Sequence, residues 1–135
     1  MSDDPPFLEA RLERGVLVLT ITRTRVEGEE IAQRLKEELL SVVADYNASS
    51  VVLDLRNTRY VSSIAFWPLL ALRKQLAGEG GRLIICGLTG AVEEVFTSTK
   101  MVDVSGATNA PFEMAPDLQT AIDRLADRPP ATPNA

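Results

Sequence analysis

The sequence predicts an α/β fold, a mixed, mostly parallel sheet of about four to five strands with an N-terminal antiparallel hairpin and about four helices. Two β-rich runs, separated by Arg14-Gly15, open the chain and are typical of a hairpin. Amphipathic helical segments then alternate with short apolar runs. Such alternation implies βαβ units, which place successive strands in parallel.

Changes in hydrophobic period define the first elements. Residues 7–13 and 16–21 are rich in β-forming side chains, and the second run alternates between two faces. From Glu29 to Tyr46, apolar side chains recur at three- and four-residue spacing with charges between them, which predicts an amphipathic helix. Its expected apolar face consists of Ile31, Leu35, Leu39, Val42, Val43 and Tyr46.

The middle of the chain predicts a central strand followed by a second helix. Residues 51–55 are almost continuously apolar and lie between polar loops, as in a strand covered on both faces. Residues 63–77 form a helical pattern that stops at Gly78, and Pro68 near its start predicts a slight kink. The expected buried stripe of this helix is Ala65, Leu69, Leu72 and Leu76.

The C-terminal third continues the alternation. Residues 82–86 are a third buried-type strand, and residues 111–114 could add a last short one. Thr89 and Asp117 stand where helix N-caps are expected, ahead of two further apolar-periodic segments. Residues 100–110 are polar and predict a loop with a strand at its start.

Length and composition favour one domain. A chain of 135 residues, 45% hydrophobic and 24% charged, can bury one core but not two. We expect this domain to span residues 7–127, between a flexible tail of residues 1–6 and a flexible, Pro-rich tail of residues 128–135. The net charge of -5 and the scattered Lys and Arg residues disfavour nucleic acid as a partner.

The chain also lacks the signals of export and membrane insertion. It begins without a basic and apolar leader, and its longest apolar run is interrupted by Pro68, well short of the roughly 20 residues of a membrane helix. We therefore expect a cytoplasmic protein. The absence of histidine and the single cysteine exclude Ser-His-Asp and Cys-His catalysis, histidine metal sites and an internal disulfide. We expect no catalytic residues, no metal, no cofactor and no enzymatic activity.

A family resemblance rests on two segments. Val51-Val52-Leu53-Asp54-Leu55 is followed by Tyr60-Val61-Ser62-Ser63, and Gly81 to Leu88 is followed by Ala91 to Phe96. In this order the segments resemble STAS domains of the anti-sigma-factor antagonists, bacterial regulators of transcription. The resemblance covers roughly residues 7–127.

The resemblance implies a protein-interaction switch. The unphosphorylated domain would bind an anti-sigma factor or serine kinase, and phosphorylation would break that complex. On the family pattern the phosphorylated residue is the second serine, Ser63, with Ser62 as the other candidate. A phosphate at a helix N-terminus is locally stabilised, while its charge, about -2, would repel an acidic partner face.

The sequence departs from the family motif Asp-Ser-Ser-Gly. Val61 stands in place of the Asp and Ile64 in place of the Gly, while Trp67 and Pro68 replace small aliphatic residues. Trp67 lies off the apolar stripe of its helix and is expected to be an interface anchor. The expected partner-binding residues are Arg23, Arg25, Ser62, Ser63, Ile64 and Trp67.

Simpler interpretations stand beside these. Ser62 and Ser63 could cap a helix, Asp54 could bind a loop at a strand end, and Cys86 is expected to be a small buried side chain. The alternative function is a constitutive STAS scaffold or a transporter-associated subunit without phosphorylation. A homodimer or a larger signalling assembly is compatible with either function.

Overall fold

The computed structural model describes residues 7–102 and 112–126. A five-stranded sheet has the order β1-β2-β4-β6-β7, and β3 and β5 form a small second sheet. The strands are β1 (Leu8–Glu13), β2 (Val16–Ile21), β3 (Arg25–Val26), β4 (Ser50–Asp54), β5 (Tyr60–Val61), β6 (Arg82–Cys86) and β7 (Glu113–Ala115). The helices are α1 (Glu29–Tyr46), the 3-10 helix η1 (Ser63–Ala65), α2 (Phe66–Gly78), α3 (Gly90–Ser98) and α4 (Leu118–Ala126).

The predicted fold class is confirmed. β1 and β2 form an antiparallel hairpin, whereas β2, β4, β6 and β7 pair in parallel. The hairpin turn is Arg14-Gly15, with φ of 55° and 80°, the left-handed conformation that matches the twist of the flanking strands.

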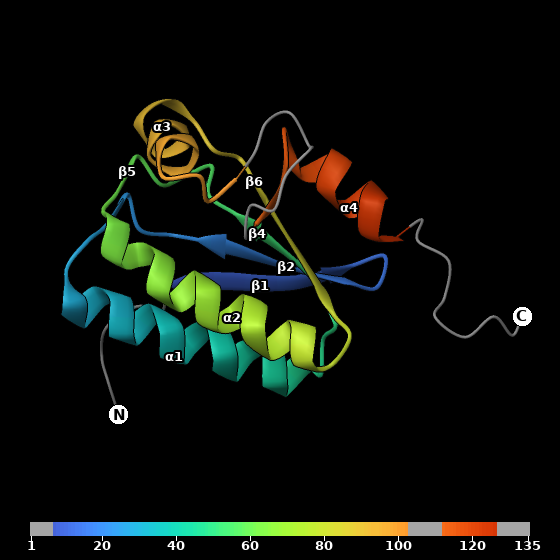
Figure 1. Ribbon diagram of the computed structural model, residues 1–135. Helices are drawn as coiled ribbons and strands as arrows, with labels where there is room; N and C mark the ends of the chain where they lie inside the picture. The colour runs from blue at the N-terminus through green and yellow to red at the C-terminus, as the bar shows by residue number, and fades with distance from the viewer. Residues whose placement is uncertain (1–6, 103–111, 127–135) are drawn as a thin grey trace, which may run out of the picture.

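The helices cover the sheet unequally. Figure 1 shows α1 and α2 side by side on one face of the sheet and α4 apart from them, and α4 packs against β2, β4 and β6. The larger core lies under α1 and α2 and the smaller one under α4. β4 serves both cores, because Val51 and Leu53 face the larger and Val52 the smaller. This double coverage explains the continuous apolar run of the central strand, which begins and ends one residue earlier than predicted.

The start of the second helix differs from the prediction. Residues 63–65 form a 3-10 turn, and the α-helix begins only at Phe66. An α-helix beginning at Ser63 would need a backbone N–H at Pro68 to bond the Ile64 carbonyl, and proline has none. A later start places Pro68 in the first turn of α2, where N–H groups lack intrahelical partners anyway. The predicted stripe of Ala65, Leu69, Leu72 and Leu76 is buried.

Helix α1 has the predicted bounds, but its apolar face is shorter than predicted. Tyr46 is 41% exposed, because it is the last helical residue and the chain turns away at Asn47, which has φ 51°. Ala32 takes part in the buried face instead, together with Leu35 and Leu39. The buried stripe of α1 therefore runs from Ala32 to Val43 and ends before the predicted Tyr46.

The C-terminal elements are where the sequence placed them, with shifts at their ends. The last strand covers Glu113–Ala115, while Phe112 forms an isolated parallel bridge with Val102. Asp117 caps α4 as predicted, since its Oδ1 accepts the Thr120 N–H at 2.8 Å, which lowers the pKa of this carboxyl. Thr89 occupies the N-cap position of α3 without a side-chain cap bond. Residues 103–111, both tails and Asp127 lie outside the described residues.

Candidate functional site

The serine pair lies in the turn that joins β5 to α2. The Ser62 N–H donates to the Val26 carbonyl at 3.0 Å, and the Ser62 carbonyl accepts from the Ala65 N–H at 2.9 Å. The Ser62 Oγ is buried and has no hydrogen-bond partner among the described residues, so it does not cap the turn. Ser63, the next residue, is exposed. The two adjacent hydroxyls therefore differ in their access to solvent.

Strand β3 brings the arginine loop beside this turn. In the parallel pairing of β3 with β5, Arg25 lies opposite Tyr60 and Val26 opposite Val61. The Tyr60 N–H also donates to the Thr24 carbonyl at 3.1 Å. Segments some 35 residues apart are thus fixed together, and the predicted neighbourhood of Arg23, Arg25 and the serines exists at the level of the backbone.

Both arginines already have partners in their own chain. Arg25 Nε donates to Glu27 at 2.8 Å, which raises the arginine pKa, and its guanidinium lies 4.5 Å from the Tyr60 ring centroid. Arg23 Nε donates to the Arg25 carbonyl at 3.1 Å, and the Arg23 guanidinium lies 4.9 Å from the Phe7 ring centroid. Because the Arg25–Glu27 ion pair is exposed, it contributes little free energy. An incoming anion could therefore replace Glu27 as the partner of Arg25 at little cost in free energy.

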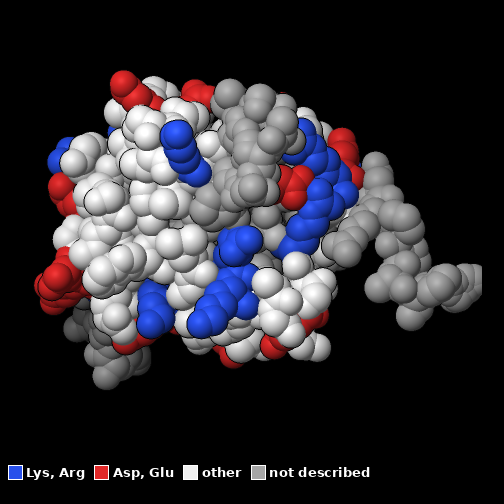
Figure 2. Space-filling view, viewed as in Figure 1, with Lys and Arg blue, Asp and Glu red and all other residues white. Residues whose placement is uncertain are grey.

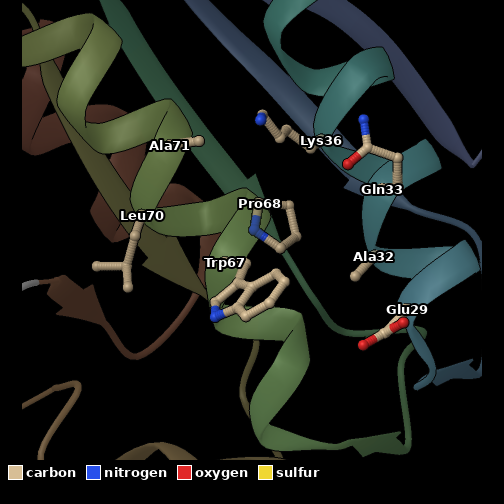
Figure 3. A pocket seen from close by; sticks show the side chains of 8 residues that line it. All are labelled: Glu29, Ala32, Gln33, Lys36, Trp67, Pro68, Leu70 and Ala71. Carbon is tan, nitrogen blue, oxygen red and sulfur yellow. The ribbon is translucent and has the colours of Figure 1, made fainter.

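Trp67 stands beside a groove between α1 and α2. Trp67 is 65% exposed, and the groove has a volume of about 600 Å³. In Figure 3 the Trp67 ring and Pro68 face α1, with Glu29 near the ring and Lys36 toward the other end. The groove is lined by Glu29, Ala32, Gln33, Lys36, Trp67, Pro68, Leu70 and Ala71.

The α1 half of this groove was not among the predicted site residues. Glu29, Gln33 and Lys36 are spaced by four and three residues, so they share one helix face. That spacing was visible in the sequence, but only the packing of α1 on α2 makes this face a groove wall. Ile64 is half-buried between Ser63 and the buried Ala65, and contributes less surface than Trp67.

A second polar cluster lies at the carboxyl ends of β4 and β6. Asp54 is 1% exposed; its Oδ1 accepts the Arg56 N–H at 3.0 Å, and its Oδ2 lies 3.2 Å from Arg56 Nε. The expected loop-binding role of Asp54 is therefore the one observed. Cys86, opposite Asp54 in the sheet, is fully buried, and burial raises its thiol pKa to about 12, with a smaller effect from Asp54. Such a thiol is a poor nucleophile.

Comparison with protein families settles the relationship. The model of the STAS domain family matches residues 9–121. The chain belongs to the STAS domain family. BtrV of Bordetella bronchiseptica, a candidate anti-sigma factor antagonist, is 33% identical over 93 residues, which cover 69% of this chain and 79% of that protein. The predicted resemblance is confirmed.

Solved structures show the same fold as this STAS domain. An anti-sigma factor antagonist from Mycobacterium paratuberculosis has a TM-score of 0.71 and 20% identity, covering 87% of this chain and 92% of that one. The antagonist SpoIIAA in its unphosphorylated form has a TM-score of 0.60 and 13% identity, covering 87% and 96%. A chain of the stressosome, described as a signal integration and transduction hub, has a TM-score of 0.65 and 20% identity, covering 88% and 96%.

Within residues 7–102 and 112–126, no helix of this STAS domain is both long and apolar enough to cross a membrane.

Proposed function

We propose that this STAS domain is a cytoplasmic partner-switching regulator that binds an anti-sigma factor or a related serine kinase, and is released when Ser63 is phosphorylated. One observation carries the proposal: an exposed serine in the 3-10 turn η1 lies four residues before a largely exposed tryptophan, which is in the first turn of α2 and lines a groove. Large aromatic side chains are common binding anchors, and a serine beside one can control access to it. The relationship to BtrV supports the anti-sigma assignment.

Accessibility favours Ser63 over Ser62 as the phosphorylated residue. A kinase must reach the hydroxyl, and Ser63 is exposed whereas the Ser62 Oγ is buried. A phosphate on Ser62 would also need space within packed structure, next to Val61, which is 3% exposed. Ser63 can accept a phosphate without such rearrangement.

The charge of the surrounding face suggests an acidic partner surface. Although the chain has a net charge of -5, α2 carries Arg73 and Lys74 and no acidic residue, and Lys36 of α1 lines the groove. Figure 2 shows Lys and Arg side chains gathered over the part of this face where α1 and α2 lie. A phosphate on Ser63 would add nearly two negative charges there and repel an acidic partner.

The test compares three variants against a partner captured from native cells with the unphosphorylated protein. Ser63→Ala is expected to keep the affinity within about threefold, and Ser63→Asp to lower it at least tenfold, about 1.4 kcal/mol. Ser49→Asp is the matched control, because Ser49 is an exposed serine that precedes β4, whereas Ser63 follows it. Its affinity is expected to remain that of the wild type.

Titration calorimetry would measure these affinities, and intact mass of the protein from native cells would report any phosphate. Equal binding by Ser63→Ala and Ser63→Asp would refute the switch. So would a phosphate found consistently at another position and absent from Ser63.

A constitutive scaffold is the second candidate, favoured by Val61 and Ile64. Where the family motif has Asp, this chain has a Val that is buried in the β3–β5 pairing, and the expected Gly is a half-buried Ile. The fold likeness to a stressosome chain is compatible with this role. Protein that stays unmodified across growth and stress conditions, within a stable assembly, would support the scaffold over the switch.

A further inference from the structure

The outer edge of β1 is unpaired in the described part of the molecule. β1 is the first strand of the five-stranded sheet and pairs only with β2. It is six residues long, whereas β7 at the opposite edge has three. A long edge strand presents a row of free N–H and C=O groups, and another strand can pair with that row.

The hairpin register shows which backbone groups face outward. Glu13 and Val16 flank the two-residue turn, so they form a hydrogen-bonded pair, and such pairs alternate along an antiparallel ladder. The Thr22 N–H donates to the Phe7 carbonyl at 2.8 Å, in agreement with this alternation. The backbone groups of Leu8, Ala10 and Leu12 therefore point to the free edge.

The side chains of the same three residues share one face of the sheet, and two of them line a cavity on that face. Leu8 and Ala10, together with Val42 of α1, line a cavity of about 730 Å³ between β1 and α1. Its charged lining residues include Arg34 and Glu38, which pair with each other at 3.3 Å. Leu12, two residues beyond Ala10 and thus on the same face of the sheet, is 59% exposed.

We propose that the occupant of this edge is a second copy of the chain, which pairs β1 with β1 in antiparallel fashion about a two-fold axis at Ala10. Leu8 then lies opposite Leu12 of the second copy, and Leu12 reaches the cavity that Leu8 and Ala10 line. On the other face of the sheet, Glu9 lies opposite Arg11 of the second copy. The two-fold axis repeats each contact, so the dimer gains two apolar pairs and two ion pairs.

Other registers are less complementary. The two-fold axis preserves the faces of the sheet, so only residues of equal parity can lie opposite each other. An axis at Arg11 would set Arg11 against itself and Glu9 against Glu13, which places like charges together. An axis at Leu12 would pair Arg11 with Glu13 but leave only residues 11–13 in strand contact. The axis at Ala10 alone combines opposite charges with an overlap of residues 8–12.

This dimer goes beyond the proposed switch, since β1 contains neither the serine pair nor the groove residues. The test is sedimentation equilibrium of the full chain over a wide range of concentrations. The mass is expected to rise from that of the 14.7 kDa chain toward twice that value. Arg11→Glu or Glu9→Arg alone should weaken dimerisation at least about tenfold, because each turns two attractive pairs into two repulsive ones.

The double variant Glu9→Arg with Arg11→Glu restores opposite charges across the axis, so its dimerisation should return to within about threefold of the wild type. This rescue separates the interface from a folding defect, since the double variant still lacks the contact of Arg11 with Glu13 in its own strand. Arg73→Glu makes the same charge reversal at an exposed position of α2, away from β1. This control variant should dimerise like the wild type. A chain that stays monomeric at every concentration would overturn the proposal, as would a dimer that is insensitive to both single reversals or is not restored by the double one.

Discussion

At the scale of single residues, Gly87 shows how closely the backbone packs around Asp54. A Cβ at Gly87 would lie 2.5 Å from Asp54 Oδ1 and 2.9 Å from the Arg56 nitrogen, and Gly87 has φ +76°. Asp54 and Arg56 hold each other through the loop hydrogen bond, so neither can move away easily. Gly87→Ala is therefore expected to lower the free energy of unfolding by about 3 kcal/mol, through backbone strain and overpacking together.

Gly80 offers a matched control for this substitution. It has the same φ of +76°, but a Cβ there would meet no atom within 4 Å. Gly80→Ala should lower the free energy of unfolding only by the cost of placing a side chain in the left-handed conformation, about 1 kcal/mol. Urea unfolding of both variants measures the difference, and equal losses would mean that the contact with Asp54 carries no cost.

The serine pair shows what a sequence can and cannot predict about a site. The motif placed two serines before a helix, and both remained candidates for capping or modification. Their separation into one buried and one exposed hydroxyl depends on β5, whose pairing with β3 holds the Ser62 backbone against Val26. That pairing joins segments distant in sequence, so no local pattern could have revealed it.

At the scale of elements, α2 divides its residues between core and surface as its periodicity predicted. Leu72 is fully buried under the sheet, whereas Trp67 is 65% exposed beside the groove. Trp67→Ala is expected to change the free energy of unfolding by less than about 0.5 kcal/mol and to weaken partner binding at least about tenfold.

The control on the same helix is Leu72→Ala, which should cost about 2 to 5 kcal/mol of stability through lost burial and a cavity. Chemical denaturation gives the stabilities, and calorimetry with the captured partner gives the affinity. A Trp67→Ala variant as unstable as Leu72→Ala would show that Trp67 is a core residue. Unchanged affinity would remove it from the binding surface.

Short elements were the ones that sequence analysis missed. β3 and β5 have two residues each, too few for any period to appear, and they form only because their backbones meet across the fold. The 3-10 turn before α2 was also missed, although Pro68, its cause, was recognised. The effect of a proline on a helix was predicted as a bend and was realised as a later α-helical start.

At the scale of the whole molecule, the fold class followed from the sequence because each βαβ unit carries its own periodic signal and the crossover rule fixes the direction of the strands. The groove between α1 and α2 and the cavity beside β1 could not be predicted from the sequence, since each needs two elements from different parts of the chain. Helix α1 is the common wall of both. Glu29, Gln33 and Lys36 face the groove with α2, while Arg34, Glu38 and Val42 face the cavity beside β1.

This shared helix permits a test of whether the two proposed interfaces communicate. Four residues of α1 spread over its length are buried: Ala32, Leu35, Leu39 and Val43. A helix packed in this way should transmit little from one face to the other. In a cycle of Ser63→Asp, Arg11→Glu and the double variant, the losses of partner affinity should add within about 0.5 kcal/mol. A larger coupling energy, measured by calorimetry below and above the dimerisation range, would instead mean that pairing at β1 alters the groove through α1.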